Sequence, residues 1–236
     1  MDKSFIILLF VLAAVTCRSQ STTGSFHVKG TDDFELSRNG TSKAWETTNW
    51  LQMPVTEGDD KRQTKVKALY SSTGIYFLFH NQDRILTASK TADFDRLWLE
   101  DVNEIFLWTD TTQTIYFEYE ISPLNVELPI LVPNVNTRFL GWLPWEYSGD
   151  RKTRHMTSVG DAEKKNGSAI KEWYAEIFIP YKLLAPLGNV PPKSGTSWRA
   201  NFYRIDYDDH QSIEWSWKRT EKTFHEFRKF GTLIFD

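Results

Sequence analysis

The chain has 236 residues, of which 40% are hydrophobic, 25% are charged and 15% are aromatic, and its formal net charge is −3. This length suits one large all-β domain or two small ones, and it is enough to bury a sizeable core. The balanced charge argues against a nucleic-acid-binding protein. A mean hydropathy of −0.46 excludes both a polytopic membrane protein and a disordered chain. Ten tryptophans stand beside nine tyrosines and sixteen phenylalanines, so we expect some of these rings to line a surface or a pocket.

The first residues have the pattern of a secretory signal peptide. Lys3 precedes an apolar run from Phe5 to Val15, and small or polar residues follow it. This run is too short to span a bilayer as a permanent helix. We expect residues 1–19 to be removed by cleavage after Ser19. The mature domain, residues 20–236, would then be secreted, periplasmic or held at the cell surface.

The single cysteine, Cys17, falls inside this expected signal. A lipid anchor on Cys17 is the alternative, although Thr16 and Arg18 on either side of it fit a bacterial lipoprotein signal poorly. After cleavage no cysteine would remain, so we expect no disulfide and no zinc site built on cysteines. No integral membrane segment is expected once the signal has been removed.

Alternating residues predict a first β-hairpin. Val66, Ala68 and Tyr70 alternate with lysines, which is typical of a half-buried strand. Residues 75–80 are apolar on both faces, as in a central strand that is covered on each side. The Ser-Ser-Thr-Gly sequence of residues 71–74 would form the tight turn between them.

A second pair of strands is predicted at Glu104–Trp108 and Thr114–Ile121. In the latter, Tyr116, Glu118 and Glu120 share one face of the strand, because side chains alternate across a sheet. The apolar residues Ile115, Phe117, Tyr119 and Ile121 share the other face.

The rest of the chain continues the β pattern, with one short helical turn at Tyr181–Leu187 after Pro180. The later strands are predicted at Trp173–Ile179, Trp198–Ile205, Ile213–Trp217 and Thr232–Phe235. We therefore expect a single all-β domain in which two antiparallel sheets pack face to face, a β-sandwich of jelly-roll or immunoglobulin-like type. Residues 122–150, rich in proline and aromatic residues, are predicted to form a long functional loop, with Trp142 and Trp145 as candidate pocket walls.

Five stretches occur in the order in which one protein family carries similar motifs. They are Trp98–Leu107 (Trp-x-x-Asp-x-x-Glu-x-Phe), Tyr116–Asn125, Trp173–Tyr181 (Trp-x-x-Glu-x-x-Ile-Pro), Trp198–Arg204 (Trp-Arg-x-Asn-Phe-x-Arg) and Phe224–Phe235 (Phe-His followed by Phe-Gly-x-Leu-x-Phe). These stretches run from residue 98 to residue 235, and the similarity extends over about residues 30–236. The chain therefore resembles the family 9 carbohydrate-binding modules, in particular small stand-alone versions found in secreted bacterial proteins.

The resemblance implies a β-sandwich that holds a sugar between two aromatic rings. It places Trp98 at the first ring position and Glu104 at a hydrogen-bonding carboxylate. Phe224 falls at the second ring position, where the best-known members of the family have tryptophan. The family's calcium ligands have no assigned positions here, so a structural calcium ion stays open and no other cofactor or metal is expected.

Five further side chains are candidate ligand-binding groups beside Trp98, Glu104 and Phe224. Glu118 and Glu120 would accept hydrogen bonds from sugar hydroxyls, or pair with Arg199 or Arg204, or simply face solvent. The other candidates are Arg204, Trp217 and His225, for each of which a structural role is the alternative.

The function that we expect is that of a secreted, non-catalytic carbohydrate-binding protein, which captures an oligo- or polysaccharide beside glycan-degrading partner enzymes. A glycoside hydrolase or an accessory subunit acting on polysaccharide is the alternative, with two acids among Glu100, Asp101, Glu104, Glu118 and Glu120 as the catalytic candidates. A haem-binding redox domain would need a methionine and a histidine as axial ligands, and Met53 and Met156 are the only methionines of the mature chain.

Overall fold

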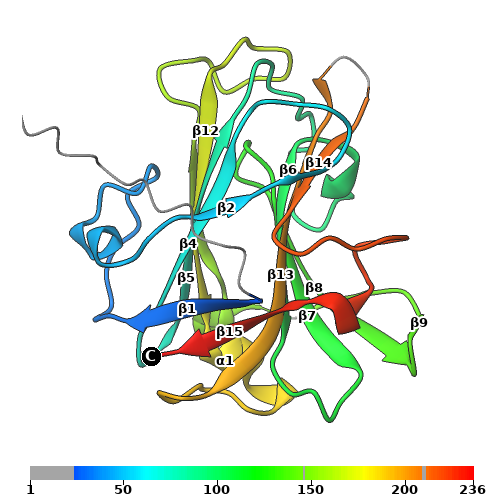
Figure 1. The fold of residues 1–236 in the computed structure, drawn as a ribbon. Helices are drawn as coiled ribbons and strands as arrows, with labels where there is room; N and C mark the ends of the chain where they lie inside the picture. The colour runs from blue at the N-terminus through cyan, green and yellow to red at the C-terminus, as the bar shows by residue number, and fades with distance from the viewer. Residues whose placement is uncertain (1–23, 146, 209–210) are drawn as a thin grey trace, which may run out of the picture.

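The computed structural model describes residues 24–145, 147–208 and 211–236. The expected signal peptide, residues 1–19, and Cys17 lie outside the described residues. Two layers of strands form the molecule and face each other across the core (Figure 1). None of the described helices is long and apolar enough to cross a membrane.

The first sheet carries the longer row of strands. Its order is β10 (Leu143–Pro144), β8 (Glu127–Val135), β7 (Ile115–Ile121), β6 (Val102–Trp108), β13 (Ser197–Asp206) and β15 (Gly231–Phe235). Three short strands attach to it: β9 (Arg138–Phe139) to β8, β14 (Ile213–Ser216) to β13, and β3 (Val55–Glu57) to β14.

The second sheet has the order β4 (Thr64–Tyr70), β5 (Gly74–Gln82), β12 (Glu172–Pro180) and β11 (Arg154–Ser158), with β2 (Leu51–Met53) attached to β4. The short helix α1 (Tyr181–Leu184) follows β12 and continues into a 3-10 turn at Ala185–Leu187. Other 3-10 turns occur at Lys43–Thr47, Leu97–Leu99, Gly149–Arg151 and Phe227–Lys229.

The strand β1 (Ser25–Gly30) joins the two sheets at one end of the sandwich. Its first four residues pair with β15, and its last two, Lys29 and Gly30, pair with β4. Both pairings are parallel, whereas the sequence predicted antiparallel sheets throughout. One strand is therefore shared by both layers, and it closes the sandwich at the end where β1 and β15 run side by side in Figure 1.

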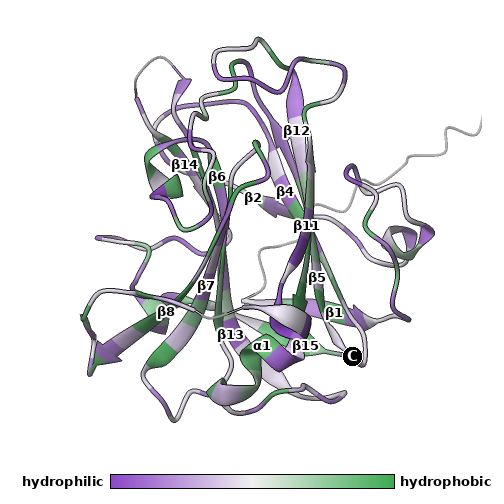
Figure 2. Cartoon of the chain, turned by 180° about the vertical axis from the view of Figure 1, so that it is seen from behind, coloured by the Kyte–Doolittle hydropathy of each residue, from purple (hydrophilic) through white to green (hydrophobic). Residues whose placement is uncertain are grey.

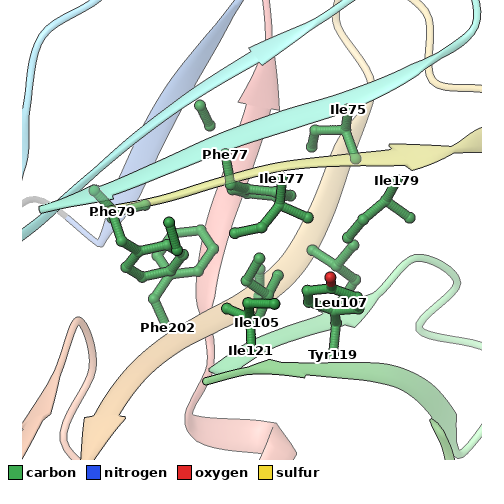
Figure 3. Close-up of a cluster of buried hydrophobic side chains, with 14 of the residues drawn as sticks. Ile75, Phe77, Phe79, Ile105, Leu107, Tyr119, Ile121, Ile177, Ile179 and Phe202 are labelled. Carbon is green, nitrogen blue, oxygen red and sulfur yellow. The ribbon is translucent and has the colours of Figure 1, made fainter. Parts of the chain in front are cut away.

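The core fills the space between the two sheets. Figure 3 shows side chains of β5 and β12, such as Phe77 and Ile177, meeting side chains of β6, β7 and β13, such as Ile105, Tyr119 and Phe202. Green bands in Figure 2 mark these hydrophobic residues along the strands of both layers. Burial of this apolar surface is the main term that stabilises the sandwich.

The prediction of a long loop at residues 122–150 is wrong over its first half. The strand β8 runs there for nine residues and pairs with β7 over residues 127–133, although it contains Pro129 and Pro133. Proline cannot donate to a ladder and is tolerated near the edge of a sheet. That is the position of β8, because only the two-residue strands β9 and β10 lie beyond it.

Candidate functional site

A pocket of about 890 Å³ opens on the outer face of the first sheet, the face turned away from the second sheet. Its floor is made by side chains of β6, β7, β8 and β13: Glu104, Phe106, Glu118, Glu120, Ile130 and Ile205. Three segments form its walls: the turn that contains Trp98, residues 139–142, and residues 219–225 after β14. The pocket thus collects residues that are far apart in the sequence.

Strand register explains why these side chains meet. Glu104 of β6 lies directly opposite Glu120 of β7, and Phe106 lies opposite Glu118. Because successive side chains alternate, their neighbours on the same strands enter the core between the sheets. The predicted division of residues 115–121 into two faces is confirmed, with Tyr116 packed in the hydrophobic cluster of the outer face.

Aromatic rings line the walls of the pocket. Trp98 lies in the 3-10 turn Leu97–Leu99, where its carbonyl accepts a 2.9 Å hydrogen bond from the Tyr207 hydroxyl. The ring of Trp142 meets Trp98 edge to face, with ring centroids 5.9 Å apart. Both tryptophans are half-buried and line the pocket, so each offers ring surface to a ligand.

A second group of rings lies on the wall formed by residues 219–225. The ring of Phe224 stacks on Tyr203 with centroids 4.0 Å apart, and the Tyr203 hydroxyl donates a 3.0 Å hydrogen bond to the Phe224 carbonyl. Phe139 stacks on His225 at 4.1 Å. Residue 224 is therefore held rigidly beside the pocket by a strand of its floor.

Three carboxylates on the pocket floor are almost fully buried. Glu104, Glu118 and Glu120 are 2%, 4% and 1% exposed. Burial is the largest cause that raises the pKa of each, to about 8 for Glu118 and well above the usual range for the other two. The neighbouring carboxylates raise the pKa values of Glu104 and Glu120 further, and one Oε2 atom on each of Glu118 and Glu120 has no hydrogen-bond partner within the described residues.

His225 packs against these acids without neutralising them. Its Nδ1 atom is 2.6 Å from the Tyr116 hydroxyl and 3.7 Å from a carboxylate oxygen of Glu118. Burial lowers the pKa of His225 to about 4, so the imidazole is neutral near pH 7. Its contacts make it a polar, uncharged part of the wall.

Six of the eight residues predicted to bind ligand line this one pocket: Trp98, Glu104, Glu118, Glu120, Phe224 and His225. The structure places Trp217 elsewhere, in the core, where its ring stacks on Phe202 and packs against Phe26. A Cβ atom on Gly231 would come within 2.4 Å of the Trp217 ring, so the glycine leaves the space that this tryptophan fills.

Arg204 also lies outside the pocket, because the alternation along β13 turns it to the opposite side of the sheet from Tyr203. Its guanidinium is fully buried, lies over the Trp215 ring at 4.4 Å and donates 2.7 Å to the Gln82 carbonyl. Arg204 therefore does not pair with Glu118 or Glu120. Arg199 is not their partner either, since it donates to the carbonyls of Arg228 and Phe230.

Among the described residues, the buried acids around Arg204 form the group whose spacing would suit a metal ion. Ligand oxygens of Asp83, Asp206 and Asp208 lie within 4.8 Å of one another. Two guanidinium groups already bind them: Arg62 is 3.4, 3.1 and 2.6 Å from the three carboxylates, and Arg204 pairs with Asp83 and Asp206. These residues fit an ion-pair network and not a calcium site.

Several pocket residues were not predicted from the sequence. Phe139, Tyr207, Glu57 and Glu214 line the pocket, and all come from short strands or turns whose partners are distant in the chain. Trp142, expected as a wall, does line it. Trp145 does not, because its indole Nε1 donates a 2.9 Å hydrogen bond to a carbonyl of α1. Neither Met53 nor Met156 lines the pocket, so no pair of methionine and histidine haem ligands is assembled there.

Comparison with known proteins identifies relatives of this architecture. The model of the family described as carbohydrate-binding family 9 matches residues 42–235. An extracellular protein of Arthroderma benhamiae is 25% identical over 185 residues, which are 73% of this chain and 78% of that protein.

Solved structures share the fold. One is from Bacteroides uniformis and is provisionally described as a carbohydrate-binding protein: 18% identity, TM-score 0.71, covering 90% of this chain and 99% of the other. Another is a family 9 module from Caldicellulosiruptor kristjanssonii in complex with cellotriose: 13% identity, TM-score 0.63, covering 90% and 93%. A family 9 module from that organism in complex with glucose has a TM-score of 0.60 at 13% identity and covers 89% and 96%.

Proposed function

Since the chain belongs to carbohydrate-binding family 9, we propose that its pocket on the outer face of the first sheet binds sugar units of a glycan without cleaving them. The observation that carries this proposal is the meeting of half-buried aromatic rings with buried carboxylates in one pocket. A sugar ring has apolar C–H faces and a rim of hydroxyl groups. Aromatic rings cover such faces, while carboxylates accept hydrogen bonds from the hydroxyls.

The ligand contacts follow from the positions of the side chains. Trp98 and Trp142 on one wall, and Phe224 and Phe139 on the other, offer ring surfaces to a sugar. The oxygens of Glu118 and Glu120 that lack partners are the acceptors for its hydroxyl groups. Because related modules were solved with cellotriose and glucose, gluco-configured oligosaccharides are the first ligands to test.

The first prediction concerns Trp98. Replacement of Trp98 by alanine removes most of the ring surface from one wall, so we expect the affinity for a bound oligosaccharide to fall about 10-fold or more, since stacking surface of this size contributes on the order of 1–3 kcal/mol. Isothermal titration calorimetry measures this change.

Trp50→Ala is the matched control. Trp50 is half-buried outside the pocket, beneath Lys65 and Lys67 on β4. Its replacement removes the same indole and should leave binding unchanged. Unaltered affinity in Trp98→Ala, or the absence of binding across a broad glycan array, would refute the proposed site.

Hydrolysis is the second candidate function, because a carboxyl with a raised pKa in a pocket can act as a general acid. Glycosidases hold their two carboxyl groups about 5–9.5 Å apart. A glycosidase also needs an ionised carboxylate beside its acid, whereas the pKa values of Glu104, Glu118 and Glu120 are all raised. We expect no new reducing ends when glycans are incubated with the protein. Their appearance, and their loss in Glu118→Gln, would assign a hydrolase instead.

The proposed function includes secretion of the protein. The signal-like residues 1–19 and the extracellular relative support export of a mature domain that starts at residue 20, where it would meet glycans and the enzymes that degrade them. N-terminal sequencing of the exported protein tests this directly. A mature chain that begins with a lipid-modified Cys17 would replace the free secreted form by a membrane-anchored one.

A further inference from the structure

The pocket carries a strong excess of acidic residues over basic ones. Six glutamates line it: Glu57, Glu104, Glu118, Glu120, Glu214 and Glu221. Only two basic residues, Arg219 and Lys222, are among its lining residues, and both are exposed at the rim. The remaining titratable groups beside the acids are the neutral His225 and three tyrosines, Tyr116, Tyr203 and Tyr207.

Like charges in this pocket lie directly opposite each other on paired strands. Glu104 is the register partner of Glu120, and Glu57 is the register partner of Glu214. Directly opposed like charges destabilise a sheet. Within the described residues no lysine or arginine forms an ion pair with Glu104, Glu118 or Glu120. By contrast, the buried Asp83, Asp206 and Asp208 elsewhere in the molecule pair with Arg62, and Arg204 pairs with two of them.

The geometry of the acids suits an organic cation better than a metal ion. Among the described residues, the acidic ligand atoms that gather within 4.8 Å of one another belong to the Asp83, Asp206 and Asp208 group and not to the pocket. The pocket is also lined by the rings of Trp98 and Trp142, which attract ammonium groups through their π faces. Aromatic walls over dispersed carboxylates therefore fit a ring-shaped ligand that carries a positive charge.

We propose that the pocket selects amino sugars with a free, protonated amine, such as the glucosamine units of a deacetylated β-linked glycan, over neutral or acidic sugars. This inference rests on the proposed function, because it names the class of sugar bound at the same site. The ammonium group is placed among Glu104, Glu118 and Glu120, where it donates charge-assisted hydrogen bonds to the oxygens that lack partners. The aromatic walls cover the faces of the sugar ring.

Because the acids of the pocket hold protons in the free protein, binding of an amine should be accompanied by a measurable release of protons. Because burial raises the pKa of Glu118 to about 8, its carboxyl holds a proton at slightly acidic pH in the free protein. An ammonium group beside it lowers that pKa, so binding releases protons to the solvent. A neutral sugar carries no charge that would lower the pKa in this way.

The experiment compares three trisaccharides that differ only at carbon 2 of each sugar: a β-1,4-linked glucosamine trimer, its N-acetylated form, and cellotriose. Calorimetric titrations are run at slightly acidic pH in two buffers of different ionisation enthalpy. We expect the glucosamine trimer to bind about 10-fold or more tightly than the other two, with a heat that depends on the buffer. We also expect its affinity alone to weaken with added salt, moderately because the acids are buried.

Substitutions of single glutamates show which residues produce the preference for the amine. Glu118→Gln and Glu104→Gln keep the shape of a neutral carboxyl group and remove the charge, so each should cancel most of the preference for the amine while cellotriose binding persists. Glu172→Gln is the matched control, because Glu172 lies on β12 outside the pocket and pairs with His80. Circular dichroism of each variant verifies the fold.

Four outcomes decide between the proposals. Preference for the glucosamine trimer with proton release supports the amino-sugar inference. Equal or tighter binding of cellotriose overturns it and leaves the proposed function standing. Absence of binding by all three, followed by a negative glycan array, overturns both. Calcium alone that binds at the pocket and is lost in Glu118→Gln would show that the acids serve a metal ion, and this also overturns the inference.

Discussion

Single buried carboxylates have opposite roles on the two outer faces of this sandwich. On the pocket side, Glu118 and Glu120 keep oxygens without partners. On the other side, Glu176 of β12 is fully buried and saturated: it accepts 2.8 Å hydrogen bonds from the backbone amide and the hydroxyl of Ser37, and a 2.7 Å bond from the indole of Trp45. One carboxylate therefore attaches the N-terminal segment that precedes β2 to the second sheet.

This arrangement predicts a strong effect of a small substitution. In Glu176→Gln an amide group must face donors with its own NH₂ group, so we expect a loss of about 1–3 kcal/mol in the free energy of unfolding. Urea denaturation measures the loss. Glu35→Gln, which changes a carboxylate that is 93% exposed, should stay within about 0.5 kcal/mol of the parent. Equal stability of the two variants would contradict the anchoring role.

At the scale of elements, β13 organises the wall that carries Phe224 and His225. Beyond the end of its pairing with β14, the side chain of Asn201 continues the ladder: its Nδ2 donates 2.8 Å to the Lys218 carbonyl, and its Oδ1 accepts 2.9 Å from the Lys218 amide. The same Nδ2 atom contacts the Tyr203 hydroxyl at 2.6 Å. A strand residue thus fixes the start of the segment that leads to the pocket wall.

Asn201→Ala should therefore affect both folding and binding. Loss of two backbone hydrogen bonds from a buried amide is expected to lower the free energy of unfolding by about 2–3 kcal/mol. We further expect faster amide hydrogen exchange in residues 218–226 than elsewhere in the first sheet, together with weaker oligosaccharide binding. Asn189→Ala is the comparison, because this side chain also bonds to backbone but at the other end of β13. Unchanged exchange in 218–226 would show that this segment is held by other contacts.

The sequence predicts strands well in two cases: where polar and apolar residues alternate, and where a short run is apolar on both faces. Residues 64–70, 74–82 and 115–121 follow this rule, and alternation correctly brings Glu118 and Glu120 to one face. It fails at β8, because its prolines are typical of loops and only its place near the sheet edge makes them tolerable. Arg204 and Trp217 show a further limit, since a polar or aromatic residue near a motif does not reveal which side of the sheet it occupies.

At the scale of the whole molecule, the candidate site exists only because the sandwich brings distant segments together. The pocket combines the turn at Trp98, four strands of the first sheet (β6, β7, β8 and β13), residues 139–142 and residues 219–225. The sequence predicted Glu104, Glu118 and Glu120 on the floor, and Phe224 and His225 in the 219–225 segment, as ligand-binding candidates. Tyr207, Glu57 and Glu214 depend on how β3 and β14 attach to β13, which no local pattern of residues encodes.

The burial of several acidic groups affects the free energy of unfolding of the whole domain. Its effect should appear as a dependence of that free energy on pH. Burial raises the pKa of Glu118 to about 8, whereas a glutamate in an unfolded chain titrates near 4.3. Between these values the folded state holds a proton that the unfolded state has lost, so stability declines as pH rises. Glu104 and Glu120 act in the same direction, as does Asp83, whose pKa burial raises to about 7.

His225 acts in the opposite direction but in a different pH range. Its pKa is lowered to about 4, so it destabilises the fold only below about pH 6.5, where an unfolded histidine takes up a proton. From about pH 6.5 to 8 the carboxyl groups therefore dominate, and we expect the free energy of unfolding to fall across this interval. Urea denaturation at a series of pH values measures the slope. Glu118→Gln should flatten it and should be more stable than the parent at the upper end, while Glu35→Gln should keep the parental slope. A parental profile that is flat or rising would mean that the pocket acids are ionised in the free protein, and ammonium binding would then release no protons.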